Sequence, residues 1–134
     1  MEATPTTYAF VERMFTVWAS QGLGDAFLHY LSDDVIWTAT GTSPLSGHYV
    51  GKRSYKENVL DRLHDKLDHS PRPEVERIIV QEDWATILFR TTGARGRNGT
   101  DFSMQYCWIV RVQDDKIREV VGFFDSKKMI DLFS

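Results

Sequence analysis

Cysteine, excess positive charge and long apolar runs are all scarce in this sequence of 134 residues. The single cysteine, Cys107, excludes a disulfide within the chain and is typical of a reducing compartment. The N-terminal MEATPTTYAF has neither the basic segment nor the apolar core of a signal peptide, and no apolar run is long enough to cross a membrane. We therefore expect a cytoplasmic protein without a membrane partner.

Positive charge is too sparse for a typical nucleic-acid-binding protein. Lysine and arginine together number 16 against 19 aspartates and glutamates, and the formal net charge is −3. Proteins that bind nucleic acid usually carry a basic patch, whereas only Arg95 and Arg97 make a local basic spot here. No nucleic-acid partner is expected.

Motifs for metals and cofactors are missing as well. The sequence has no glycine-rich phosphate loop and no nucleophile elbow. His29, His64 and His69 do not cluster with carboxylates at metal-ligand spacing, and Cys107 is alone. We expect neither a metal nor a cofactor.

Apolar residues are plentiful enough to form a core. Hydrophobic residues make up 42% of the chain and aromatic residues 13%, which indicates a globular protein. The length suits one domain over residues 1–134, because no linker, repeat or low-complexity segment divides it.

The first half of the chain predicts three helices. Thr4-Pro5 is typical of a helix cap and first turn, and the Gly22-Leu23-Gly24 segment would end that helix. A short second helix would run through residues 25–31, and a third through residues 52–67.

Strands are predicted around and after the third helix. Residues 35–40 are β-branched and aromatic, while residues 41–51 are rich in glycine, serine and proline and predict a loop. Residues 74–81 and 84–94 then predict two strands, and Asn98-Gly99 marks a hairpin connection.

The next predicted strand shows strict alternation. The even positions of this strand are almost all large and apolar: Phe102, Met104, Tyr106, Trp108, Val110 and Val112. Such a period of two predicts a strand with one buried face. A last strand follows it, and residues 127–133 are a candidate C-terminal helix. Helices followed by strands in hairpin succession predict an α+β fold, with an antiparallel sheet covered by helices on one face.

The order of these motifs resembles the nuclear-transport-factor-2-like superfamily, and within it the SnoaL-like and ketosteroid-isomerase-like proteins. The residues that carry the resemblance extend over nearly the whole chain: Leu31 to Trp37, Ser46 to Lys52, Glu82-Asp83-Trp84, Tyr106-Cys107-Trp108, and Lys116 to Glu119 with Phe123-Phe124-Asp125. The resemblance implies a cone-shaped curved antiparallel sheet packed on three N-terminal helices, enclosing an apolar pocket. It also implies homodimers formed through the outer face of the sheet.

Asp125 is the first candidate for catalysis. It is similar in position to the last-strand aspartate that limonene epoxide hydrolase-like and cyclase-like members use as a general base. A carboxylate surrounded by Phe123, Trp108 and Tyr106 would be desolvated, which would raise its pKa. Tyr106 or the Trp108 indole would then stabilise an enolate. The alternative is a solvated or helix-capping aspartate before Ser126-Lys127-Lys128.

Large apolar side chains supply the ligand-binding candidates. These are Phe15, Trp18, Trp37, Tyr55, Met104, Trp108 and Phe123. Tyr106, Trp108 and Phe123 would line the pocket if even positions of the alternating strand and odd positions of the last strand face inward; the alternative is plain core packing. His48 is a further candidate acid or base at the pocket mouth, or else a solvated loop histidine.

Two known constellations of the superfamily are incomplete. Trp37 and Ala39 stand where epoxide hydrolase-like members have tyrosine and asparagine, and residues 88–92 lack their Arg-x-Asp pair. Thr38-Ala39-Thr40 lacks the ketosteroid isomerase base, and Phe15 and Trp18 hold the face that carries its oxyanion tyrosine. Epoxide hydrolysis and true ketosteroid isomerisation are therefore not expected.

Two hypotheses remain. The first is a cofactor-independent isomerase or cyclase acting on a small hydrophobic carbonyl compound. The second is a non-catalytic module that binds an apolar ligand or a partner. Residues 75–80 and 84–89 are apolar at both parities, which is typical of strands covered on both faces and favours a homodimer through the sheet.

Overall fold

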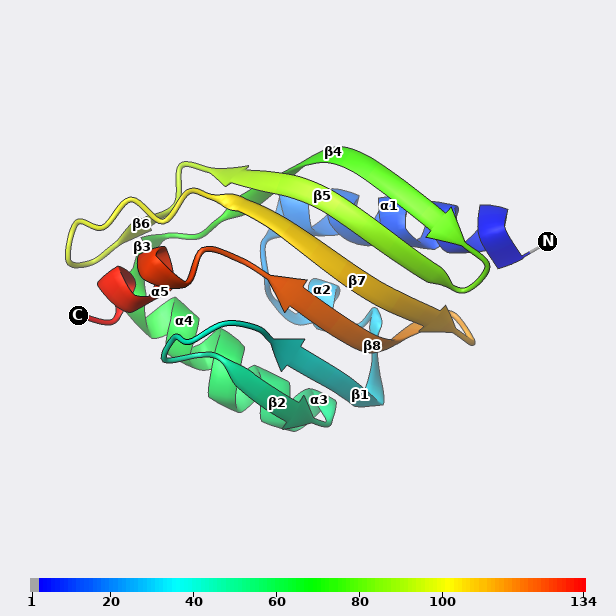
Figure 1. Cartoon of the computed structure of the whole chain (residues 1–134), viewed down its shortest axis with the longest axis horizontal. Coiled ribbons are helices and arrows are strands. Elements are labelled where there is room, and N and C mark those ends of the chain that lie inside the picture. Colours follow the sequence, from blue (N-terminus) through cyan, green and yellow to red (C-terminus); the bar gives the residue numbers. More distant parts are fainter. Residues whose placement is uncertain (1–2) are drawn as a thin grey trace.

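The computed structural model describes residues 3–134, with side chains from Pro5 onward. The helices and strands of the described residues follow one another in this order: α1 (Ala3–Gln21), α2 (Asp25–Leu28), β1 (Leu31–Ala39), β2 (Gly47–Val50), α3 (Lys52–Tyr55), η1 (Lys56–Leu60), α4 (Asp61–Lys66), β3 (Leu67–His69), β4 (Arg72–Gln81), β5 (Trp84–Thr92), β6 (Arg95–Gly96), β7 (Gln105–Gln113), β8 (Lys116–Phe123) and α5 (Ser126–Leu132). The predicted α+β class is confirmed, and Figure 1 shows the curved sheet with its helices.

Helix α1 has the predicted apolar stripe, and Met14, Phe15 and Trp18 are each at most 3% exposed. The helix begins at Ala3, before the expected cap Thr4, whose side chain lies outside the described ones. It ends at Gln21, where Gly22 adopts a φ of 84° that favours glycine. This helix therefore lays an aromatic face on the sheet.

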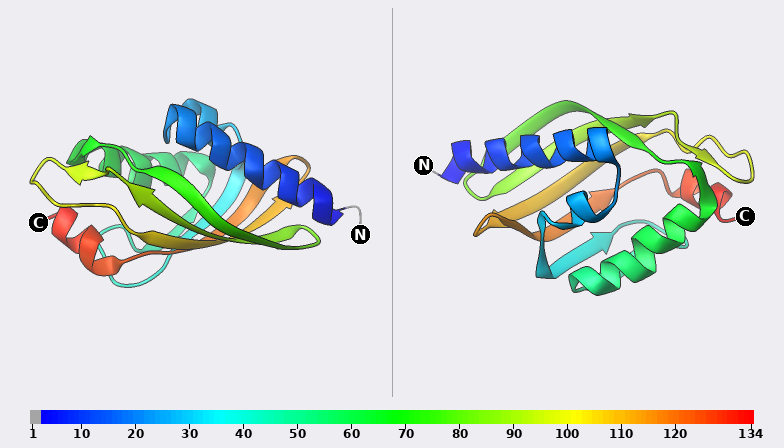
Figure 2. Two further views of the ribbon diagram at one scale, coloured as in Figure 1. Left: turned by 90° about the horizontal axis from the view of Figure 1, so that it is seen from above. Right: turned by 180° about the vertical axis from the view of Figure 1, so that it is seen from behind.

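The third predicted helix is one continuous rod with a wide turn in its middle. It comprises α3, the π-helical segment η1 and α4. The wider turn lets the adjacent residues Val59 and Leu60 both point inward, at 8% and 2% exposure. Viewed from behind, this rod and α1 lie on the same face of the sheet (Figure 2).

The main sheet has the strand order β2-β1-β8-β7-β5-β4. All its pairs are antiparallel except β1 with β8, which are parallel. The expectation of a wholly antiparallel sheet is therefore wrong at one junction, because β1 and β8 are distant in the sequence and no hairpin joins them. Several boundaries also differ: α2 ends at Leu28, β1 already begins at Leu31, the predicted loop 41–51 contains the edge strand β2, and β7 begins only at Gln105.

Strand β7 confirms the predicted alternation, since Trp108, Val110 and Val112 are all buried. Strand β8 changes parity part-way along. Arg111 pairs with Glu119 while Val112 pairs with Ile117, so Arg118 is an extra residue that forms a β-bulge. After the bulge, even positions of β8 face the helices.

A small second sheet closes one end of the fold. Strand β6 pairs antiparallel with β3, and the Asn98-Gly99 turn follows it. The Asn98 side-chain amide donates to the Asp131 carbonyl of α5, the predicted C-terminal helix, which the structure confirms. Within the described chain, no helix has the length and apolar character needed to cross a membrane.

Candidate functional site: an apolar pocket

A cavity of about 60 Å³ lies between the sheet and the helices. Its lining comes from helices, strands and loops throughout the chain: Trp18, Leu23, Trp37, Ala39, Leu45, Tyr55, Val59, Leu60, Leu63, Pro71, Tyr106, Trp108, Gly122, Phe124 and Met129. Since one water needs roughly 10–15 Å³ of such space, the cavity holds only a few water-sized groups. The predicted apolar pocket is present, and it is small.

Trp108 stands at the centre of an aromatic cluster. Its ring stacks on that of Trp18 with centroids 5.3 Å apart and planes 13° apart. It meets the rings of Trp37 and Phe89 edge-on, each at 5.0 Å. Phe15 contacts it at 5.6 Å. Helix α1 and strands β1, β5 and β7 thus converge on one indole.

Trp37 and Tyr55 form another wall of the pocket. Their rings stack with centroids 3.9 Å apart and planes inclined by 18°. Trp37 comes from β1 and Tyr55 from the end of α3, so the stack joins the long helical rod to the sheet.

Several polar atoms of this apolar lining have no protein partner. The Trp18 indole N–H donates to the Pro71 carbonyl at 3.0 Å. By contrast, the Trp37 and Trp108 indole N–H groups and the Tyr55 hydroxyl make no hydrogen bond to any described residue. None of these atoms is among the fully shielded polar atoms without a partner, so each reaches open space. The pocket therefore presents hydrogen-bond donors to whatever occupies it.

The two pocket phenols stay neutral. Burial raises the pKa of Tyr55 well above its ordinary value, and the nearby Tyr106 adds to the shift. Burial also raises the pKa of Tyr106, although the Thr91 hydroxyl opposes part of that shift. Both residues act as hydrogen-bond donors at ordinary pH.

Phe123 does not line the pocket, and the predicted parity of the last strand is wrong at this point. Its side chain is 45% exposed on the opposite face of the sheet. The bulge at Arg118 shifts the alternation by one residue. Consequently Gly122 and Phe124 line the pocket in its place.

Asp125 is not held in an apolar pocket, contrary to the first expectation. The residue is exposed and is the N-cap of α5. Its Oδ1 accepts from the backbone N–H groups of Lys127 at 3.0 Å and Lys128 at 3.4 Å. The alternative interpretation, a capping aspartate before the C-terminal helix, describes its geometry.

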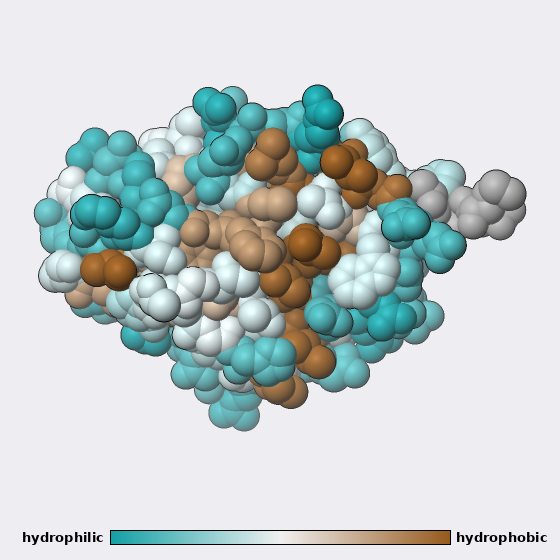
Figure 3. Space-filling view, in the orientation of Figure 1, coloured by the Kyte–Doolittle hydropathy of each residue, from teal (hydrophilic) through white to brown (hydrophobic). Residues whose placement is uncertain are grey.

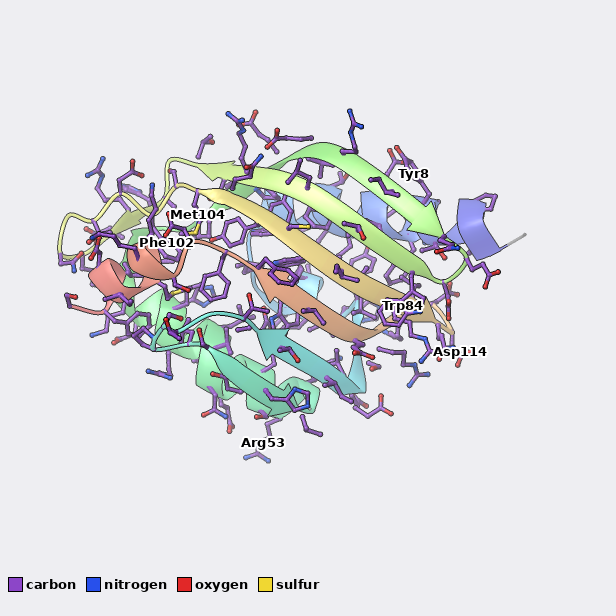
Figure 4. All side chains as sticks on the ribbon, viewed as in Figure 1. Tyr8, Arg53, Trp84, Phe102, Met104 and Asp114 are labelled. Carbon is purple, nitrogen blue, oxygen red and sulfur yellow. The ribbon has the colours of Figure 1, made fainter. Side chains whose placement is uncertain are left out.

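The other candidates divide between lining and support. Trp18, Trp37, Tyr55, Tyr106 and Trp108 all line the pocket, as predicted. Phe15 and Met104 are buried but lie outside the lining; Phe15 packs beneath Trp108. Figure 4 shows Met104 beside Phe102 at the end of the sheet near α5.

His48 lies away from the pocket on the edge strand β2. It is exposed, and its Nδ1 forms a 2.9 Å hydrogen bond with the Thr38 hydroxyl on the outer side of β1. The placement at the pocket mouth is therefore wrong.

Sequence reasoning missed Gly122, which faces Trp108 directly across the β7–β8 pair. A Cβ atom at this position would lie 3.3 Å from Trp108 Cδ1 and Nε1, tighter than ordinary contact. A glycine within a strand is the available signal for such a close approach. The helical spacing of Val59, Leu60 and Leu63 predicts that they lie on the apolar side of the third helix. It does not predict which part of that side reaches the cavity.

The profile of the SnoaL-like domain family matches residues 11–120. The chain belongs to this family. The SnoaL-like match spans β1 and β7, which contribute Trp37, Ala39, Tyr106 and Trp108 to the pocket lining. The NTF2-like architecture expected from the sequence is therefore confirmed. Among curated proteins, none matches this SnoaL-like chain.

Solved structures share the fold at low sequence identity. An NTF2-like protein from Burkholderia thailandensis E264 is similar with a TM-score of 0.80 and 19% identity, covering 96% of this chain and 97% of that one. Bal32a, from a soil-derived mobile gene cassette, gives 0.81 and 13%, covering 98% and 99%. An LEH-like epoxide hydrolase from M. tuberculosis gives 0.71 and 16%, covering 96% and 90%. At these identities the likeness shows the fold alone.

Proposed function

We propose that this SnoaL-like protein binds a small, neutral, largely apolar ligand that carries a hydrogen-bond acceptor such as a carbonyl oxygen. The observation that carries the proposal is the set of unpartnered donors, the Trp37 and Trp108 indoles and the Tyr55 hydroxyl, in an otherwise apolar lining. Because these donors reach open space rather than being fully shielded, an acceptor in the pocket can form hydrogen bonds with them, each worth about 0.5–1.5 kcal/mol. An apolar molecule with an acceptor would meet both requirements.

Binding without catalysis fits the pocket better than isomerisation or cyclisation. Abstraction of a proton from carbon needs a positioned base. Within the described residues, the lining contains no carboxylate and no imidazole. Its two phenols are neutral, and Asp125 is engaged with the start of α5. The donors would orient a carbonyl group, but nothing in the lining is placed to take its α-proton.

A titration with cyclopentanone tests the binding proposal. The chain has four tryptophans, and their indole N–H groups give separate signals in a proton–nitrogen correlation spectrum, assigned with single Trp→Phe variants. Cyclopentanone should shift the signals of Trp37 and Trp108, while Trp84, which is outside the pocket lining, serves as an internal control. Methylenecyclopentane has the same shape but no acceptor, so it should bind more weakly. Unchanged pocket signals at saturating ketone would refute the proposal.

A homodimer through the outer face of the sheet is a second proposal. Apolar residues from five strands lie on the face opposite α1 to α4. Ile79, Ile109 and Val121 lie in one register row together with Thr86, Thr38 and His48. Ile36 and Val50 lie in the neighbouring row of the same face, which also holds Glu119. Val50 and Ile79 are 66% and 60% exposed.

Figure 3 shows this hydrophobic stripe across the sheet, and α5 lies at one end of the sheet rather than over it (Figure 1). A stable pair needs about 800 Å² buried on each partner. A second copy would cover apolar side chains that the helices leave open to water. The oligomeric state in solution tests this proposal.

A further inference from the structure

Trp108 fills the space that a larger ligand would need. Its ring touches those of Trp18 on α1, Phe27 on α2, Trp37 on β1 and Phe89 on β5. A side chain that meets two helices and two other strands spans the whole gap between the sheet and the helical layer. The remaining cavity of about 60 Å³ is well below the roughly 300–1,000 Å³ of common ligand pockets.

Packing against its neighbours, without a hydrogen bond, holds the Trp108 indole in place. Gly122 lies directly opposite on β8, and a Cβ atom there would crowd the Trp108 ring at 3.3 Å. The Trp108 indole N–H makes no hydrogen bond to a described residue. Shape alone therefore fixes the ring in the middle of the pocket.

We infer that Trp108 is the residue that sets the upper size limit of the ligand, restricting the pocket to compounds of about one small ring. This inference rests on the proposed binding function and adds the size class of the ligand. A smaller apolar residue at position 108 opens the same pocket to fused-ring ketones. The surrounding walls, including the Trp37–Tyr55 stack, remain in place to receive them.

Three ketones of increasing size test the inference: cyclopentanone, acetophenone and methyl naphthyl ketone. Affinities are measured for the wild-type protein and for Trp108→Leu, which keeps part of the apolar bulk in the core. The Trp37 indole signal reports binding in both proteins. Trp84→Leu is the matched control, because Trp84 lies on the outer face and is 37% exposed (Figure 4).

Wild type and Trp84→Leu should bind cyclopentanone and should not bind methyl naphthyl ketone. Trp108→Leu should bind the naphthyl ketone at least about tenfold more tightly than wild type, since even one methylene shifts discrimination in an apolar pocket by about that factor. Dispersion of the proton spectrum shows whether the variant is folded, and Trp108→Phe repeats the measurement with a milder change.

The two proposals fail in different ways. A wild-type protein that binds none of the three ketones overturns the binding function. A wild-type protein that binds cyclopentanone, but binds the naphthyl ketone as tightly as folded Trp108→Leu does, overturns only the role of Trp108. Failure of both folded Trp108 variants to bind the naphthyl ketone also overturns that role.

Discussion

The Tyr55 phenol lies flat against the Trp37 indole, with ring centroids 3.9 Å apart and planes inclined by 18°. One ring belongs to the helical rod and the other to β1. The contact therefore ties two layers of the fold together and also brings two hydrogen-bond donors to the same cavity. Structure and binding can be separated here, because the Tyr55 hydroxyl can be removed without removing the ring.

Tyr55→Phe is expected to weaken ketone binding while leaving the fold intact. The variant keeps the stack on Trp37 and loses only a hydroxyl that has no protein partner. Loss of one hydrogen bond to the ligand costs about 0.5–1.5 kcal/mol, which is a few-fold to about tenfold in Kd. The spectral titration with cyclopentanone measures it. Tyr8→Phe, at an exposed residue outside the pocket, is the control; equal losses in the two variants would contradict a role for Tyr55.

Alkaline pH should destabilise the wild-type protein through Tyr55. Burial raises the pKa of this phenol in the folded state, while the unfolded phenol titrates near about 10. Below that pH both states hold the proton and the stabilisation is complete. Above it the unfolded state loses the proton first, so the free energy of unfolding falls by up to about 1.4 kcal/mol per pH unit until the folded pKa is passed.

Urea unfolding at a series of pH values measures this effect. Tyr55→Phe serves as the reference, because it has no proton to lose at this position. The wild-type free energy of unfolding should fall more steeply with pH than that of the variant. Parallel curves would show that Tyr55 titrates at its ordinary pKa in the folded protein.

Asp125→Ala should lower stability without affecting ligand binding. The side chain caps α5 through the backbone N–H groups of Lys127 and Lys128, and removal of such a cap costs about 1 kcal/mol. Asp125→Asn retains a capping side chain and should lose much less. Thermal or urea unfolding measures both. If the Asp125→Asn protein is folded but no longer binds ketone, Asp125 takes part in ligand binding and the prediction is wrong.

Ile109→Lys should dissociate the proposed homodimer. Ile109 lies in the middle of the outer apolar stripe, next to Val121 in register, and a lysine there would bury an unpaired charge in the interface. Ile130→Lys is the matched control, because Ile130 is 43% exposed but lies on α5, away from the stripe. Light scattering on both variants and on wild type measures the state. A monomeric wild-type protein at micromolar concentration would refute the dimer.

Much of the fold follows from local patterns in the sequence. The apolar stripe of α1, the alternation before and along β7, and the glycine after α1 each act within a few residues, so they could be interpreted without knowing the tertiary structure. The same is true of five pocket aromatics, Trp18, Trp37, Tyr55, Tyr106 and Trp108. Each follows its own element's periodicity, and the structure places all five in the lining.

The errors concern features that depend on distant partners. Alternation along β8 predicts the wrong face for Phe123, because a single extra residue, Arg118, reverses that alternation. A bulge is defined by pairing between strands, which one strand's sequence does not show. Asp125 illustrates a different limit: its neighbours are aromatic in the sequence, but its carboxylate interacts with the backbone that follows. A cap and a pocket base look alike until the chain direction after Phe124 is known.

The insertion of β8 between β1 and β7 has a consequence for how the protein assembles. Strands β1 and β2 have no hydrogen-bonded connection to β7, β5 and β4 until β8 is in place between them. Helix α1 packs on β4 and β5, where Phe15 and Trp18 meet Phe89, so these aromatic residues have a partner sheet without β8. Trp37 on β1 joins that sheet only when residues 116–123 are in place. Because the pocket lining combines Trp37 of β1 with Trp108 of β7 and Gly122 of β8 itself, the pocket is complete only once β8 has joined the two parts of the sheet.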